Sequence, residues 1–198
     1  MGAVLVPAAS PLAAQHVAGR TPDRNVPMPV VIDAKGAFQD KLARVGNDMY
    51  IAGQPTADGI RQLHDQGVTT VVNLRTPSEM ARIGFDEAAL VASLGMTYVY
   101  LPVRGDSLYP YSPATLDKLA AAMKDAKGGV LLHCTVAWRA SHLWAAYLIR
   151  ERGVPVDSAL AQTRLINLMD DMRSTKGRQP VEEFLNRDIS ALARGRKM

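Results

Sequence analysis

The chain alternates short apolar runs with amphipathic segments, and this alternation limits its fold more than any other feature. Apolar, β-branched or strand-like runs occur at 49–52, 68–74, 96–103 and 129–132. Helical spacing of apolar residues, often between capping and stop residues, occurs at 55–67, 86–95, 112–126, 140–152, 155–171 and 180–193. This order predicts an α/β fold with a parallel or mixed central sheet flanked by helices. In such sheets, ligands bind beyond the carboxyl ends of the strands.

Composition indicates one folded domain behind a leader. The chain has 198 residues with 47% hydrophobic content, which is enough for one substantial core. Gly2 to Ala14 is rich in alanine and valine and resembles part of a signal peptide, and Pro7 and Pro11 interrupt it, so we expect no membrane span. We therefore expect a leader over residues 1–35 and one domain over 36–198. The protein would be periplasmic or secreted, or cytoplasmic if the leader is not an export signal.

The charge balance is compatible with an anionic ligand. Formal net charge is +4, and part of the excess lies in a basic C-terminal tail. The sequence contains no motif for nucleic-acid binding. One cysteine and four scattered histidines give no ligand spacing for a tight metal site. We therefore expect no metal, no cofactor and no nucleic acid.

The single cysteine lies where a strand meets a helix. Cys134 follows the apolar run at 129–132 and precedes the amphipathic segment that begins near Ala140. A thiol there faces the unpaired N–H groups and the positive dipole end of the helix, which favour thiolate and form an anion cradle. Arg139 ends the loop with a planar fork that suits two oxygens of a phosphate or sulfate. A buried cysteine that only packs is the structural alternative.

These residues resemble a known loop. His133-Cys134, four residues, Arg139 and then Ser141 is similar to the loop of cysteine-dependent protein phosphatases, shortened by one residue between cysteine and arginine. With the runs IAGQP at 51–55 and VVNLR at 71–75, the chain resembles the bacterial phosphatase-like family that also occurs fused to beta-lactamase-fold hydrolases. The resemblance covers roughly 42–153. It implies a dual-specificity-phosphatase-like fold and hydrolysis of phosphate monoesters through a cysteinyl-phosphate intermediate.

The resemblance also implies which groups bind the phosphate. The Arg139 guanidinium and the loop amides would surround its oxygens, which assigns substrate binding to Thr135, Val136, Ala137 and Trp138. Arg75, at a strand end, either joins this anion site or holds an acidic partner such as Glu79. The expected substrate is a phosphorylated small molecule or a phosphoprotein.

Three further residues match catalytic positions of these phosphatases. Asp106 corresponds to the loop aspartate that protonates the leaving group, although a solvated loop carboxylate would look the same. Ser141 corresponds to the hydroxyl that helps the thiolate leave, and its plainer interpretation is a first-turn serine. His133 corresponds to the histidine that tunes the nucleophile, and a strand-end histidine with a satisfied hydrogen bond would look identical.

Two features leave other functions open. Ala137 stands where phosphatase loops usually carry glycine, and because alanine disfavours positive φ it indicates a different backbone path. The spacing from Cys134 to Arg139 equals that of the rhodanese loop, so a sulfurtransferase with a Cys134 persulfide is the alternative enzyme. Sulfur transfer would not need Asp106. A module that binds a phosphorylated ligand with little or no turnover is the third hypothesis.

Overall fold

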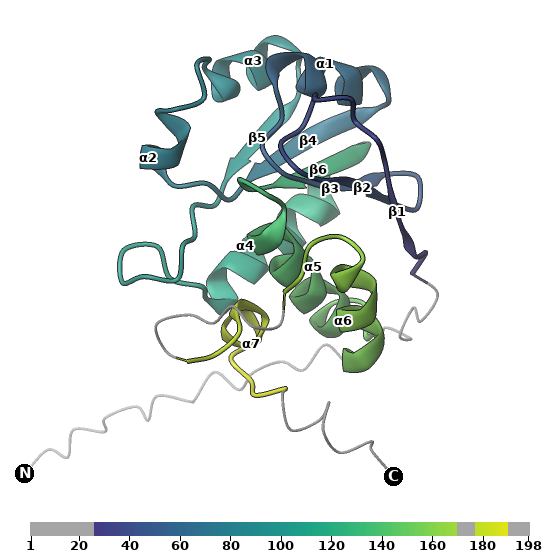
Figure 1. Cartoon of the computed structure of the whole chain (residues 1–198), viewed down its shortest axis with the longest axis vertical. Coiled ribbons are helices and arrows are strands. Elements are labelled where there is room, and N and C mark those ends of the chain that lie inside the picture. Colours follow the sequence, from purple (N-terminus) through teal and green to yellow (C-terminus); the bar gives the residue numbers. More distant parts are fainter. Residues whose placement is uncertain (1–25, 170–176, 190–198) are drawn as a thin grey trace, which may run out of the picture.

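The fold is a mixed six-stranded sheet with helices on both faces, as Figure 1 shows for the computed structural model, which describes residues 26–169 and 177–189. The strands are β1 (Pro29–Val31), β2 (Leu42–Val45), β3 (Met49–Ala52), β4 (Val68–Asn73), β5 (Thr97–Tyr100) and β6 (Gly129–His133). The helices are α1 (Ala57–Asp65), α2 (Pro77–Met80), α3 (Glu87–Ser93), α4 (Pro113–Asp125), α5 (Trp138–Arg150), α6 (Val156–Arg164) and α7 (Pro180–Leu185). The prediction of an α/β fold with a mixed sheet is confirmed.

The strand order places the cysteine in the middle of the sheet. The order is β1-β2-β3-β6-β4-β5, with antiparallel pairs from β1 to β3 and parallel pairs from β3 to β5. Because β6 lies between β3 and β4, the residue that follows it has a strand end on either side. Cys134 therefore lies at the carboxyl edge of the parallel part, where α/β sheets bind ligands.

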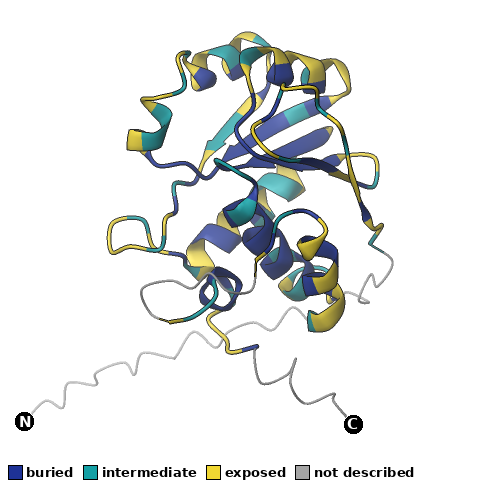
Figure 2. Cartoon of the chain, viewed as in Figure 1, coloured by how far each residue is buried: buried dark blue, intermediate teal, exposed yellow. Residues whose placement is uncertain are grey.

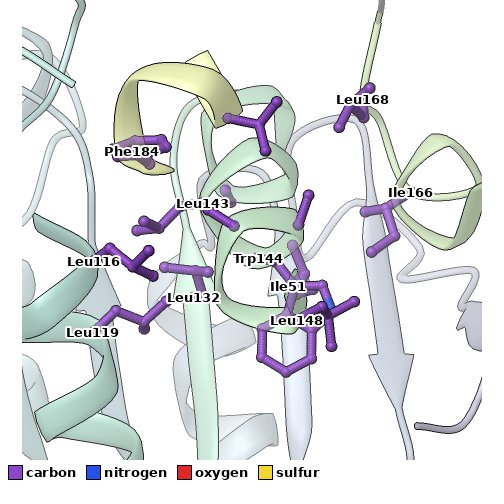
Figure 3. Close-up of a cluster of buried hydrophobic side chains, with 14 of the residues drawn as sticks. Ile51, Leu116, Leu119, Leu132, Leu143, Trp144, Leu148, Ile166, Leu168 and Phe184 are labelled. Atoms are coloured by element: carbon purple, nitrogen blue, oxygen red, sulfur yellow. The ribbon is translucent and has the colours of Figure 1, made fainter. Parts of the chain in front are cut away.

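Alternate residues of the central strands supply two apolar cores. On one face, α1 and α3 contribute Ile60, Leu63 and Val91, which pack against residues such as Leu131. On the other face, α4, α5 and α7 cover the neighbouring residue Leu132 and its counterparts, and this larger core also reaches Ile166 and Leu168 beyond α6 (Figures 1 and 3). The central strands β3, β4 and β6 are accordingly almost entirely buried (Figure 2). This double burial fixes the position of the loop after β6.

Local signals account for most helix starts. The Thr56 side chain accepts a hydrogen bond from Gly59 N at 3.0 Å and begins α1, and Asp86 accepts one from Ala89 N at 2.9 Å and begins α3. Helix α4 begins at Pro113, as a proline in the first turn predicts. The helices predicted at 55–67, 86–95 and 112–126 therefore form close to the expected positions, at 57–65, 87–93 and 113–125.

The C-terminal helices differ from the prediction. Helix α6 ends at Arg164 instead of continuing to residue 171, because the Thr163 carbonyl accepts hydrogen bonds from the N–H groups of residues 166, 167 and 168 and turns the chain. Helix α7 ends at Leu185, where Asn186 adopts a left-handed conformation with φ 48°. Residues 190–193 of the predicted helix lie outside the described residues.

The N-terminal edge of the sheet was not predicted. Strand β1 pairs with β2 and lies within residues 1–35, the segment expected to be a leader, so the described fold begins before residue 36. Proline is tolerated at the start of such an edge strand because no ladder N–H is needed there. The apolar run from Gly2 to Ala14 lies outside the described residues. Over 26–169 and 177–189, no helix is both long and apolar enough to cross a membrane.

Candidate active site

The loop that carries Cys134 is anchored to both neighbouring strands. Cys134 N donates a hydrogen bond to Ala52 O at 3.2 Å on the β3 side. On the β4 side, Leu74 N donates to His133 O at 3.0 Å. The cysteine itself is 1% exposed. The backbone at the nucleophile is thus an extension of the central sheet, which restricts the directions that the sulfur can face.

Gly53 allows the loop to lie directly against the chain that follows β3. A Cβ at this position would lie 1.7 Å from Gln39 O and 2.9 Å from Thr135 O, which no side chain can occupy. The next residue, Gln54, donates its backbone N–H to Thr135 O at 2.9 Å. The Gly-Gln-Pro sequence is of a kind common in turns, but here its glycine lets two backbone segments come into direct contact.

Three consecutive loop carbonyls, those of residues 135–137, accept hydrogen bonds from groups outside the loop or from the helix that follows it. Thr135 O accepts from Gln54 N, Val136 O accepts from the Asn167 side-chain amide, and Ala137 O accepts from both N and Oγ of Ser141. In a trans peptide the following N–H points opposite to the carbonyl, and no cis bond occurs among the described residues. The N–H groups of residues 136, 137 and 138 therefore project away from these anchors, as an anion cradle requires.

Ala137 adopts the conformation that its residue type disfavours. Its φ is 65°, in the left-handed region, and it is the residue that precedes helix α5. The alanine takes up the left-handed geometry itself, so the expectation that it would avoid a positive φ was wrong. The conformation costs on the order of 1 kcal/mol for a residue with a Cβ. Helix α5 then begins at Trp138, two residues before the predicted start, which brings Arg139 into its first turn.

Glu79 fixes the Arg139 guanidinium. Arg139 Nη2 lies 2.6 Å from Glu79 Oε1, and Arg139 Nη1 lies 3.0 Å from Glu79 Oε2. Nη2 also donates to Thr135 Oγ1 at 3.0 Å, and Nη1 donates to Val103 O at 2.8 Å. Nη2 thus lies between the carboxylate and the cysteine loop. Nη1 also donates to Leu74 O at 3.3 Å, so the arginine cannot swing away without breaking a bidentate pair and three further bonds.

This ion pair decides the charge of both partners. Burial raises the pKa of Glu79, but hydrogen bonds from Arg139, Thr76 N and Thr135 outweigh burial and lower that pKa to about 2. For Arg139, burial lowers the pKa, while Glu79 and the nearby Cys134 raise it by more, so the net direction is upward. Both groups are therefore charged over the whole physiological pH range.

Of the two alternatives for Arg75, the ion pair with the Glu79 carboxylate does not form. Arg75 Nη2 reaches the backbone carbonyl of Glu79 at 3.0 Å, and Nη1 donates to Gln54 Oε1 at 2.5 Å. Arg75 is 6% exposed, and burial, together with Arg139, lowers its pKa despite the opposing charges of Glu79 and Glu87. Arg75 therefore places a second buried cation near the loop, and its role in substrate binding stays a prediction.

His133 rests on a buried carboxylate. Its Nε2 lies 3.1 Å from Glu87 Oε1, and both side chains have no exposed surface. Glu87 also accepts hydrogen bonds from Gln54, Asn73 and Tyr98 at 2.7, 2.8 and 3.1 Å. Burial raises the pKa of Glu87, but His133, Gln54 and Tyr98 outweigh burial and lower it. The network holds the residue before the cysteine in one orientation.

Ser141 and Asp106 occupy structural positions. Ser141 is fully buried in α5, and its Oγ donates to Ala137 O at 2.9 Å. Asp106 is exposed, and its Oδ1 accepts from the N–H groups of Leu108 and Tyr109 at 3.0 and 2.7 Å. Both arrangements match the plainer interpretations of these residues. Their catalytic roles therefore stay predictions.

Two hollows border the loop, and Arg82 lines both of them. One of about 330 Å³ contains Arg139 together with Ser78, Glu79, Arg82, Arg104, Tyr111 and Trp138. The other, of about 550 Å³, is lined in part by Thr135, Gln54, Arg75 and Arg82. In the parts of the chain that the structure describes, no three His, Cys, Asp or Glu side chains come together as a metal site would need.

Sequence reasoning considered Glu79 only beside Arg75 and missed its pairing with Arg139. A usable signal was Thr76-Pro77-Ser78-Glu79, a capping-box pattern with proline in the first turn. It predicts the short helix α2, with the carboxylate folded back to Thr76 N at 2.8 Å. That pattern does not indicate the second partner, Arg139, which lies 60 positions later.

Residues 41–148 match the family described as beta-lactamase hydrolase-like protein, phosphatase-like domain, and they make up more than half of the chain. The chain belongs to this phosphatase-like family. A beta-lactamase hydrolase-like protein of Xylella fastidiosa (strain Temecula1) is 28% identical over 107 residues, which is 53% of this chain. One from Agrobacterium fabrum is 28% identical over 106 residues. The matched part spans 24% of the length of each of these relatives.

Solved structures share the fold of this family member. A DUF442 protein from Shewanella putrefaciens CN-32 is 29% identical with a TM-score of 0.58, covering 76% of this chain and 93% of its own. Pseudomonas aeruginosa TpbA, at 20% identity and a TM-score of 0.56, covers 83% of this chain and 93% of its own, and shows the fold alone. The family match, together with this fold, supports phosphatase activity. The recognition of the family from its loop and strand motifs is confirmed.

Proposed function

We propose that the chain hydrolyses phosphate monoesters through a cysteinyl-phosphate intermediate on Cys134. The observation that carries the proposal is the loop itself. Its carbonyls are bound on the outside, its N–H groups project the other way, and a charged Arg139 is fixed beside it by Glu79. Preorganised donors of this kind stabilise the charge that develops on a phosphoryl group in transfer.

In the first step the Cys134 thiolate attacks phosphorus. The sulfur–phosphorus bond forms as the bond to the ester oxygen breaks, and that oxygen takes a proton from Asp106 and leaves as the alcohol. Arg139 and the loop amides bind the three remaining oxygens. Asp106 belongs to the loop after β5, and Arg104 of the same loop lines the hollow that contains Arg139. The loop that carries the proton donor therefore borders the hollow that contains Arg139.

In the second step water attacks phosphorus on the enzyme. The sulfur–phosphorus bond breaks, inorganic phosphate forms, and the Asp106 carboxylate accepts the proton of the water. Ser141 assists by donating a hydrogen bond to the departing thiolate, for which its hydroxyl turns away from Ala137 O. His133, held by Glu87, acts as a positioning residue for the cysteine backbone.

The ligands of two structural neighbours suggest which class of substrate to assay. A TpbA variant is solved in complex with phosphotyrosine, and PTPMT1 is solved in complex with PI(5)P; they are 20% and 18% identical to this chain. A phosphorylated small molecule or a phosphoprotein is therefore the class to assay.

The test compares phosphate release from p-nitrophenyl phosphate with sulfur transfer from thiosulfate to cyanide. We expect the wild-type chain to release phosphate and Cys134→Ser to lose this activity. Rapid acid quench of the wild-type reaction should trap the cysteinyl phosphate. Phosphate release that survives Cys134→Ser unchanged contradicts the covalent mechanism. Sulfur transfer without phosphate release would instead establish the sulfurtransferase.

A further inference from the structure

We propose that the phosphate ester hydrolysed by this chain carries a second anionic group, and that Arg82 and Arg104 bind that group beside Arg139. The inference rests on the proposed function and names the substrate class for the same site: small esters with two phosphates, or with a phosphate and a carboxylate. It assigns a specificity role to two arginines that the chemical steps do not use.

The first observation is the charge in one hollow. Arg139, Arg82 and Arg104 all line the same volume of about 330 Å³. The opposing carboxylate, Glu79, is bound to both terminal nitrogens of Arg139 and to Thr135 Oγ1, so its charge is already matched. Two guanidinium groups therefore remain in excess in the hollow that Arg139 lines.

The second observation is how Arg82 and Arg104 are held. Each is anchored by its backbone N–H, Arg82 to Glu79 O at 3.3 Å and Arg104 to Tyr109 O at 2.7 Å. Both residues are exposed, and neither forms an ion pair within residues 26–169 and 177–189. Their positions are thus set by the backbone, while their charged groups are available to a ligand.

The third observation is that the two arginines come from different segments. Arg82 follows α2, and Arg104 lies in the loop after β5. Arg82 also lines the neighbouring hollow with Thr135 and the buried Arg75, so positive charge continues from one hollow into the next. Guanidinium groups bind phosphate and carboxylate oxygens with directed, charge-assisted hydrogen bonds. A hollow of this size accommodates a small molecule.

The experiment measures the preference for a second phosphate at constant leaving-group chemistry. A series of short alkanediol monophosphates is compared with the matching bisphosphates of increasing linker length, by kcat/KM for phosphate release. After correction for two equivalent esters, we expect a preference of about tenfold at the best linker length, as one or two charge-assisted contacts supply. Because the contacts lie at the surface, the preference falls as salt rises.

Variants assign the preference to these residues. We expect Arg82→Gln and Arg104→Gln each to reduce it, and the double variant to bring it to about one. Arg61→Gln is the matched control, since Arg61 is an exposed arginine on α1 that pairs with Asp58. Thermal unfolding of each variant checks that the fold is retained. A preference that survives the double variant, or that Arg61→Gln removes equally, overturns the assignment.

A binding measurement separates this inference from the catalytic proposal. With Cys134→Ser, calorimetry compares the affinity of the same monophosphate and bisphosphate without turnover. Tighter binding of the bisphosphate that depends on Arg82 and Arg104 supports the subsite even if no ester is hydrolysed. Equal binding of both ligands beside normal hydrolysis of p-nitrophenyl phosphate rejects the subsite and leaves the proposed function intact.

Discussion

Replacing Glu79 by glutamine gives a quantitative test of the ion pair that holds Arg139. The substitution keeps the size of the side chain and removes its charge, so that the guanidinium loses its only bidentate partner among the described residues. A shift of the Glu79 pKa from 4.5 to about 2 corresponds to about 3 kcal/mol of folding free energy. Part of the carboxylate is exposed, so we expect a loss of about 2 kcal/mol at neutral pH.

The stabilisation by Glu79 should depend on pH. The pKa of Glu79 is lower in the folded protein, so its contribution is complete above the unfolded value of about 4.5 and disappears as pH falls toward 2. Urea unfolding of wild type and Glu79→Gln is therefore measured from pH 7 down to the lowest pH at which the fold persists. The difference between the two proteins should shrink steadily below about pH 5.

A surface carboxylate provides the control. Glu151 pairs with Arg150 at 2.5 Å on the surface of the protein, and Glu151→Gln should cost less than about 1 kcal/mol. In Glu79→Gln, turnover of p-nitrophenyl phosphate should also fall, because Arg139 loses its bidentate partner and is held beside the loop only by its remaining hydrogen bonds. A destabilisation that is the same at pH 7 and pH 3 would show that the pair is not the cause.

Three other changes test the loop and the proposed chemistry. Ala137→Gly should raise the free energy of unfolding by up to about 1 kcal/mol in urea titrations, since glycine adopts φ 65° freely; a marked loss would contradict the strain argument. Asp106→Asn should lower kcat for an alkyl phosphate by on the order of 10²–10⁴, with a smaller loss for p-nitrophenyl phosphate. Equal, small losses for both esters would exclude Asp106 as the acid. Iodoacetate should alkylate Cys134, and inorganic phosphate should protect it in wild type but poorly in Arg139→Lys, as mass spectrometry would show.

Parts of the fold set by local chemistry could be predicted from the sequence. The β-branched run of β4 and the proline at the start of α4 act within a few residues, so the sequence shows them directly. Asp106 is similar: an aspartate in a Gly-Asp-Ser loop is a turn signal, and the structure gives it a turn. Strands β1 and β2 could not be predicted in this way, because two of the three β1 residues are exposed and Arg44 interrupts the four residues of β2.

The supports of the site could not be predicted, because they join distant segments. Glu87 has the position of an ordinary first-turn acid of α3, where exposure would be expected, yet it is 2% exposed and binds His133, 46 positions later. Glu79 meets Arg139 across 60 positions. No local pattern encodes either pairing. Both become visible only once the strand order places β6 between β3 and β4.

The anchor of the Val136 carbonyl has a consequence for domain dissection. Its donor, Asn167, lies beyond α6 and outside the segment 41–148 that the family shares. Phe184, which packs into the same core as Leu143, also lies outside that segment. A fragment trimmed to the shared segment would keep the cysteine and the arginine but would lose an external brace of their loop. The portable unit for grafting or fusion is therefore larger than the region that sequence similarity marks out.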